Sequence, residues 1–139
     1  ALAVEEGVDA IIDIATLTGA ALMALGQLTA PVLGNDQRVV DLTLAASAVT
    51  GEPLWQLPLE RKYRPQLDSE IADISNLGGP YAGATTAALF LDHFAGTTPW
   101  AHLDIAGTMQ TDKDDSYRTA GATGFGARIL LETAAAFAG

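Results

Sequence analysis

Two spacings of apolar residues recur along the chain, one typical of buried strands and the other typical of helices. The run 8–15 is short, β-branched and mostly apolar, so we expect a strand that is buried on both faces and central in a sheet. Thr18 is the expected N-cap, and Gly26 the expected end, of the helix that follows. A second short strand is predicted over 30–34, so the chain begins as strand, helix, strand.

The alternation continues after residue 34 with one interruption. Asn35 or Asp36 is expected to cap a long helix that Gly51 ends. Repeated prolines and little periodicity predict an irregular segment over 52–83, at the sheet edge or the rim of a site, with a helical piece favoured over 60–67. The remaining predicted elements are a helix over 85–94 closed by Gly96, a strand over 100–106, a loop over 107–124 and a helix from about 125 to 137.

This order of elements predicts an α/β fold, with helices flanking a mixed, largely parallel central sheet. No internal repeat or low-complexity linker divides the chain, so no domain boundary is expected within it. Residues 1–7 resemble the last turns of a helix that ends at Gly7, and no Met begins the chain. We therefore expect a segment of a larger protein.

Composition limits the number of domains, the kinds of binding partner and the cellular location that we expect. The chain has 139 residues, 49% of them apolar, which is enough for one domain with a sizeable core. Its formal net charge of −10 opposes binding to phosphate backbones, so we expect no nucleic-acid partner. The absence of cysteine excludes disulfides and thiolate metal sites. No apolar run approaches the length of a membrane span and acidic residues follow the start, so we expect no signal peptide and no membrane partner. Without cysteine, the reducing cytoplasm is the expected location.

The turn 16–20 is the first candidate binding site. It follows a predicted strand and begins a helix, which is where open α/β sheets bind ligands and where backbone N–H groups are free. Gly19 would let a ligand approach the main chain closely. An ordinary strand-to-helix turn has the same pattern, and the glycine spacing of a nucleotide-binding loop is missing.

His102 and Asp104 are the second candidate. They lie two residues apart on one predicted strand, so their side chains share a face and could reach a metal or form a proton-transfer pair; a structural hydrogen bond is the alternative. His93 is expected on a solvated helix face. The acidic run 112–115 lacks the spacing and terminal Glu of a calcium loop, and no Gly-x-Ser-x-Gly motif is present. The residues alone predict a binding site without catalytic machinery.

Several sequence blocks, taken together in order, resemble the C-terminal half of the catalytic domain of leucyl aminopeptidases, also called cytosol aminopeptidases. The two longest are Asp-Ala-Ile-Ile-Asp-Ile-Ala-Thr-Leu-Thr-Gly-Ala over 9–20 and Trp-Ala-His-Leu-Asp-Ile-Ala-Gly over 100–107. The resemblance covers essentially the whole chain. Shorter blocks that resemble family segments are found at 51–59, 72–78, 82–88 and 121–124.

The resemblance implies hydrolysis of an N-terminal peptide bond, leucine-like residues preferred, with two divalent ions, zinc or manganese, activating a water. It also implies a homohexamer. The family's metal ligands, its catalytic Lys and its Arg near the metals lie in preceding segments, ending with the motif N-T-D-A-E-G-R-L, which this chain lacks. Residues 1–139 would be the C-terminal part of an incomplete three-layer α/β/α catalytic domain. We expect no metal ligand, no catalytic residue and no activity in this part alone.

The resemblance implies that this chain supplies substrate-binding residues of the site. Backbone groups of Leu17 and Gly19 match positions that hydrogen-bond the peptide. Ala106 and Met109 match positions in the pocket for the first side chain, and Leu77 matches one near the following side chain. The complete set of matched positions is Thr16, Leu17, Gly19, Leu77, Ala106 and Met109.

Two other classes of function stay open. The chain could be a folded structural or assembly piece without activity of its own. It could also be a small-ligand binding module that uses the turn 16–20. A comparison of aminopeptidase activity between the chain and a protein extended upstream would distinguish these two classes from an aminopeptidase.

Overall fold

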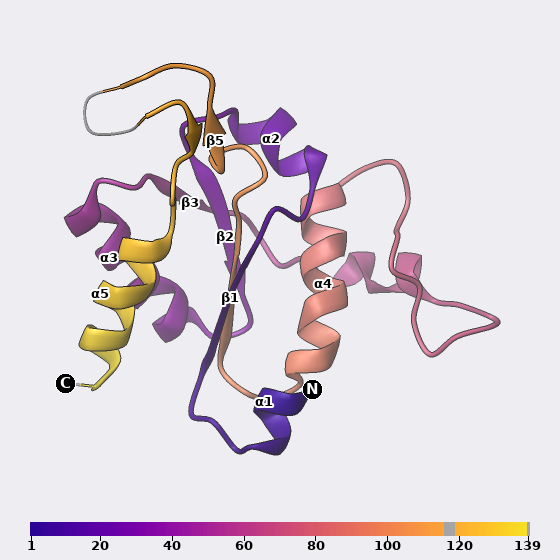
Figure 1. Ribbon diagram of the computed structural model, residues 1–139. Coiled ribbons are helices and arrows are strands. Elements are labelled where there is room, and N and C mark those ends of the chain that lie inside the picture. The colour runs from indigo at the N-terminus through magenta and orange to yellow at the C-terminus, as the bar shows by residue number, and fades with distance from the viewer. Residues whose placement is uncertain (116–118, 139) are drawn as a thin grey trace.

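Helices lie on both faces of a four-stranded sheet in the computed structural model, which describes residues 1–115 and 119–138 (Figure 1). The helices are α1 (Leu2–Glu5), α2 (Gly19–Leu25), α3 (Gln37–Thr50), the 3₁₀ helix η1 (Arg61–Leu67), α4 (Gly83–Ala95) and α5 (Ala127–Ala138). The strands are β1 (Ile11–Ala15), β2 (Ala30–Gly34), β3 (Leu54–Gln56), β4 (Trp100–Asp104), β5 (Gln110–Thr111) and β6 (Gly121–Ala122).

The main sheet has the strand order β1-β4-β2-β3. β1 runs parallel to β4 and β2 parallel to β3, while β2 and β4 are antiparallel. β5 and β6 form a separate antiparallel pair. The predicted α/β fold, with a mixed and largely parallel sheet between helices, is confirmed.

The position of β1 corrects one expectation. The run 8–15 was expected to form a central strand buried on both faces, but β1 begins at Ile11, and all of its residues are only half-buried. Among the described residues it pairs with β4 alone, so it lies at an edge. β-branched apolar residues favour a buried strand, but the number of strands that pair with it depends on other segments of the chain.

The helix ends follow their expected local signals. Thr18 caps α2, with its side chain accepting the N–H of Ala21, and Gly26 ends the helix with a positive φ of 73°. Asp36, rather than Asn35, caps α3 by accepting the N–H of Val39, and Gly51 ends it in the left-handed conformation.

Two clusters of buried side chains hold the helices against the sheet. On one face, α3 and α5 pack on residues such as Val32 and Leu103, which are fully buried. On the other face, α4 packs on Leu33 and Trp100. Figure 1 shows α3 and α5 on one side of the strands and α4 on the opposite side. No helix of the described residues is long and apolar enough to cross a membrane.

The irregular segments contain more pairing than their sequence predicts. β3 was not predicted in 52–83, and β5 and β6 were not predicted in the loop 107–124. These strands have two or three residues, too few to show an alternating pattern. The helical piece expected over 60–67 is present as η1, in which Pro65 is accommodated by 3₁₀ geometry.

Candidate functional site

The carboxyl ends of β1 and β4 lie side by side and place two loops next to each other. Ala15 and Asp104 are partners in the parallel register, and the N–H of Ile105 continues the ladder by donating to the Ala15 oxygen at 2.8 Å. The loop after β1 leads into α2, and the loop after β4 carries residues 105–109. Parallel neighbouring strands of an α/β sheet bind ligands at this edge.

One buried carboxylate joins these two loops. Asp104 is 1% exposed, and its Oδ1 accepts the N–H groups of Leu17 (3.1 Å), Thr18 (3.2 Å) and Ala106 (3.2 Å). Its Oδ2 accepts the Thr18 hydroxyl at 2.6 Å, and the same hydroxyl accepts the N–H of Ala21 at the start of α2. The side chain of Asp104 therefore fixes the backbone of both loops.

A cavity of about 360 Å³ opens in front of the β1 loop. It brings together the backbone of the turn 17–19 and, from the segment before α4, Leu77 and neighbouring glycines. Leu77 is 77% exposed and Leu17 40% exposed, so both apolar side chains are available to a ligand. The residues that line this cavity are Leu17, Thr18, Gly19, Asn76, Leu77, Gly78, Gly79, Gly83, Thr86 and Ala87.

Three residues singled out from the sequence do not line this cavity, namely Thr16, Ala106 and Met109. Thr16 is exposed just before the cavity wall, and Ala106 is half-buried. Ala106 is linked to the cavity-lining turn only indirectly, because its N–H and the N–H of Leu17 donate to the same oxygen of Asp104. The structure thus brings Leu17, Gly19 and Leu77 together, and Asp104 links the backbone of Ala106 to that of Leu17.

His102 and Asp104 share a strand face but bond to different partners. The His102 ring is buried, and its Nδ1 lies 2.6 Å from Asp13 Oδ1 on β1. The indole N–H of Trp100 donates to the other oxygen of Asp13, and the Trp100 ring stacks on His102. His102 Nε2 is buried without a hydrogen-bond partner among the described residues. This Asp13, Trp100 and His102 group ties β1 to β4.

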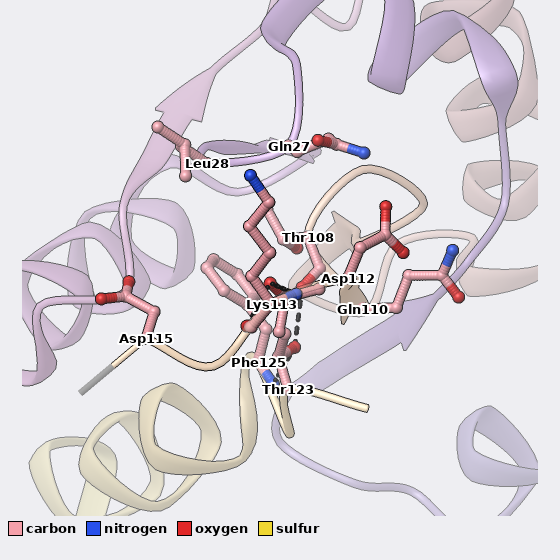
Figure 2. Close-up of a pocket in the computed structure, with 10 residues that line it drawn as sticks. Gln27, Leu28, Thr108, Gln110, Asp112, Lys113, Asp115, Thr123 and Phe125 are labelled. Atoms are coloured by element: carbon pink, nitrogen blue, oxygen red, sulfur yellow. Dashed lines mark hydrogen bonds between the residues drawn. The ribbon is translucent and has the colours of Figure 1, made fainter. Parts of the chain in front are cut away.

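A second cavity, of about 320 Å³, lies between the turn after α2 and the loop after β4 (Figure 2). Gln27 and Leu28 form one wall, and Lys113 projects into the space from the other. Asp112 and Asp115 of the acidic run also line it, while Asp114 accepts the N–H of Ala120 instead. Figure 2 shows carboxylates, amides and an ammonium group around one space, so this cavity has mixed charge rather than one dominant sign.

In the part of the chain that the structure describes, the donor groups do not form a dimetal centre of the kind that the resemblance implies. Among residues 1–115 and 119–138, no three His, Asp or Glu side chains converge so that they could hold a metal ion. Asp104 already accepts four hydrogen bonds, and Asp13 is bonded to His102 and Trp100. We therefore assign no metal ligand to the described part of the chain.

Residues 1–131 match the family model described as "Cytosol aminopeptidase family, catalytic domain". The chain belongs to this family. The match includes both loops that Asp104 joins and the segment that carries Leu77, so the candidate site lies within a catalytic domain of the family.

Curated relatives and a solved structure show how much of the domain is present. The chain is 51% identical to the "Probable cytosol aminopeptidase" of Geobacter sulfurreducens, over 88% of the chain and 25% of that protein. It is 48% identical to that of Alkaliphilus metalliredigens, over 95% of the chain and 26% of that protein. The solved structure "Bottromycin maturation enzyme BotP in complex with Mn" is similar with a TM-score of 0.87 and 41% identity, over 94% of the chain and 29% of BotP. The chain thus spans about a quarter of the length of these relatives.

Proposed function

We propose that the chain is the C-terminal part of the catalytic domain of a metal-dependent aminopeptidase and supplies the substrate-binding wall of its site. The observation that carries the proposal is the convergence of Leu17, Gly19 and Leu77 on one cavity at the carboxyl edge of the sheet, in a chain of the cytosol aminopeptidase family. The turn 16–20 and Leu77 are far apart in sequence, and an ordinary strand-to-helix turn does not require them to meet.

In this proposal the backbone of Leu17 and Gly19 hydrogen-bonds the peptide, with Thr16 at the entrance. Leu77 contacts the side chain that follows the scissile bond. Ala106 and Met109 form the pocket for the first side chain once the rest of the catalytic domain is in place. Met109 is 37% exposed, which leaves its side chain available for that contact. An apolar pocket of this kind suits leucine, whose burial contributes about 1.5–3 kcal/mol.

The metal ligands belong, in this proposal, to a part of the protein outside residues 1–139. Two divalent ions would activate a water and polarise the scissile carbonyl when bound there. The similar structure of BotP contains Mn, which supports manganese beside zinc as the candidate ion. The relatives' description as cytosol aminopeptidases supports a cytoplasmic location, and we further propose a homohexamer.

The decisive experiment compares the chain alone with an upstream-extended protein that includes the N-T-D-A-E-G-R-L segment. Both are incubated with Mn²⁺ or Zn²⁺ and leucine p-nitroanilide. We expect hydrolysis by the extended protein only. Inactivity of both would favour the structural or assembly alternative, and activity of the chain alone would contradict our assignment of the metal ligands.

The first prediction concerns metal binding by the chain itself. Because Asp104 and Asp13 are already bonded to protein donors, we expect calorimetry to show no stoichiometric site for Zn²⁺ or Mn²⁺. A site of micromolar or tighter affinity that disappears in His102→Ala would contradict this prediction, since it would mean that the ring of His102 leaves Asp13 to bind metal.

The second prediction concerns Ala106 in the extended, metal-loaded enzyme. We expect Ala106→Phe to lower kcat/KM for a leucine substrate about tenfold more than for an alanine substrate, because the larger group fills space meant for the substrate side chain. The matched control is Ala135→Phe, the same change at an exposed position of α5, which should affect neither. An equal loss for both substrates in Ala106→Phe would show a folding defect or a wrong pocket assignment.

A further inference from the structure

Asp104 is the only side chain of the described residues that we find bonded to the backbone of both candidate-site loops. It accepts Leu17 and Thr18 from the loop after β1 and Ala106 from the loop after β4. Neither loop has a comparable anchor in the sheet ladder, which ends at the bond between Ile105 and Ala15. Asp104 is therefore the hydrogen-bonded link between the backbones of the two loops.

The bonding of this carboxylate is complete. Its two oxygens receive three backbone N–H groups and one hydroxyl, which is about the full acceptor capacity of a carboxylate. Asp104 is also 1% exposed, so solvent does not compete for these bonds. Hydrogen bonds to a buried ionised acceptor are stronger than neutral ones, and they hold their donors in one geometry.

Thr18 transmits this constraint to α2. Its hydroxyl donates to Asp104 Oδ2 and accepts the N–H of Ala21, so the first turn of α2 and Asp104 share one oxygen atom. Gly19 is the first residue of α2 and lies between these two contacts. The bonds of Thr18 therefore constrain the backbone from which the N–H of Gly19 projects.

We propose that Asp104 is a positioning residue: it sets the spacing between the backbone that binds the peptide, at Leu17 and Gly19, and the pocket loop that begins at Ala106. This inference rests on the proposed function. Asp104 touches neither substrate nor metal in this role. It acts through the orientation of peptide groups, for which a displacement of about 1 Å can lower the rate by about 10²-fold.

The experiment uses the upstream-extended enzyme loaded with Mn²⁺, and its first readout is hydrogen exchange followed by mass spectrometry. In Asp104→Asn, amides in peptides covering 16–19 and 105–107 should exchange at least about tenfold faster, because their N–H groups are left with a single neutral amide oxygen, a weaker acceptor than a carboxylate. A peptide covering β2 should be unchanged. Unchanged exchange in both loops would overturn the inference, whether or not the protein is an aminopeptidase.

The second readout is steady-state kinetics with leucine p-nitroanilide, corrected for the folded fraction. We expect Asp104→Asn to lower kcat/KM about 10²-fold with a higher KM, and Thr18→Val to lower it about tenfold. Thr18→Ser keeps the hydroxyl and should restore kcat/KM to within about threefold of wild type. If KM stays at the wild-type value in Asp104→Asn and in Thr18→Val, Asp104 is only structural and the inference is wrong.

Glu52→Gln is the matched control. Glu52 is also a buried carboxylate, 2% exposed, and it accepts the N–H of Ile129 and the guanidinium of Arg128, on the face covered by α3 and α5. We expect this variant to have a lower Tm and a wild-type KM. A wild-type enzyme without aminopeptidase activity would overturn the proposed function, while the exchange experiment would still decide whether Asp104 holds the two loops together.

Discussion

Replacement of Gly107 by alanine is expected to destabilise the chain by about 3 kcal/mol, at the upper end of the usual cost of overpacking. A Cβ at this position would lie 2.1 Å from the carbonyl oxygen of Gly26 and 3.4 Å from Leu22 Cδ1. The Gly26 carbonyl is a backbone group and cannot turn aside as the end of a flexible side chain can. The loop that carries Ala106 would have to move away from α2 instead.

Urea denaturation of wild type and variant measures this loss. Gly19→Ala is the matched control, because a Cβ at Gly19 meets no atom within 4 Å and the residue has no positive φ. We expect Gly19→Ala to leave stability unchanged or to raise it by up to about 1 kcal/mol, since alanine restricts the unfolded chain. Equal stability of Gly107→Ala and wild type would show that this contact between the loop and α2 is not tight.

The helix ends are the part of the fold that the sequence predicts best, because a cap is an interaction between residues close in sequence. Thr18 and Asp36 each accept an N–H three residues later, and Gly26 and Gly51 each end a helix with a positive φ. None of these features depends on the rest of the chain. Local residue type is therefore sufficient to predict them.

Strand neighbours are not predictable in this way, because pairing is a property of two segments. The apolar run of β1 is compatible with a central position, yet β4 alone pairs with it among the described residues. β3 has three residues, follows Gly51 and lies between Pro53 and Pro58, so its sequence resembles a loop. Its strand conformation comes from pairing with β2.

In the candidate site, too, local features are predictable from the sequence and contacts between distant segments are not. The turn 16–20 is recognisable as a strand-to-helix junction, whereas Leu77 was selected only by the family resemblance, as a position near the second side chain of the substrate. The role of Asp104 depends on contacts with residues 86 and 87 positions earlier, which no local pattern reveals. An Asp at the carboxyl end of a strand, beside a second strand that ends in an exposed turn, is the one signal that could have suggested it.

Replacement of Trp100 by alanine is expected to lower the free energy of unfolding by about 3–5 kcal/mol. Trp100 is 2% exposed and packs with Leu33 and Ala88 between the sheet and α4. Its indole N–H also donates to Asp13, and its ring stacks on His102. The change would therefore leave a cavity and remove one of the bonds that tie β1 to β4.

Trp55→Ala is the matched control, since Trp55 is 64% exposed on β3 and should cost less than about 1 kcal/mol. The chain has two tryptophans, so each variant leaves the other as the single fluorophore. In Trp55→Ala, emission of the buried Trp100 should lie at shorter wavelength than emission of Trp55 in Trp100→Ala, and thermal unfolding should shift it to the red. If the two variants lose equal stability, the cluster around Trp100 does not contribute to stability as its burial indicates.

Trp100→Phe separates the contribution of packing from that of the hydrogen bond. We expect this variant to retain most of the ring packing and to lose the bond to Asp13, so its stability should lie between those of Trp100→Ala and wild type.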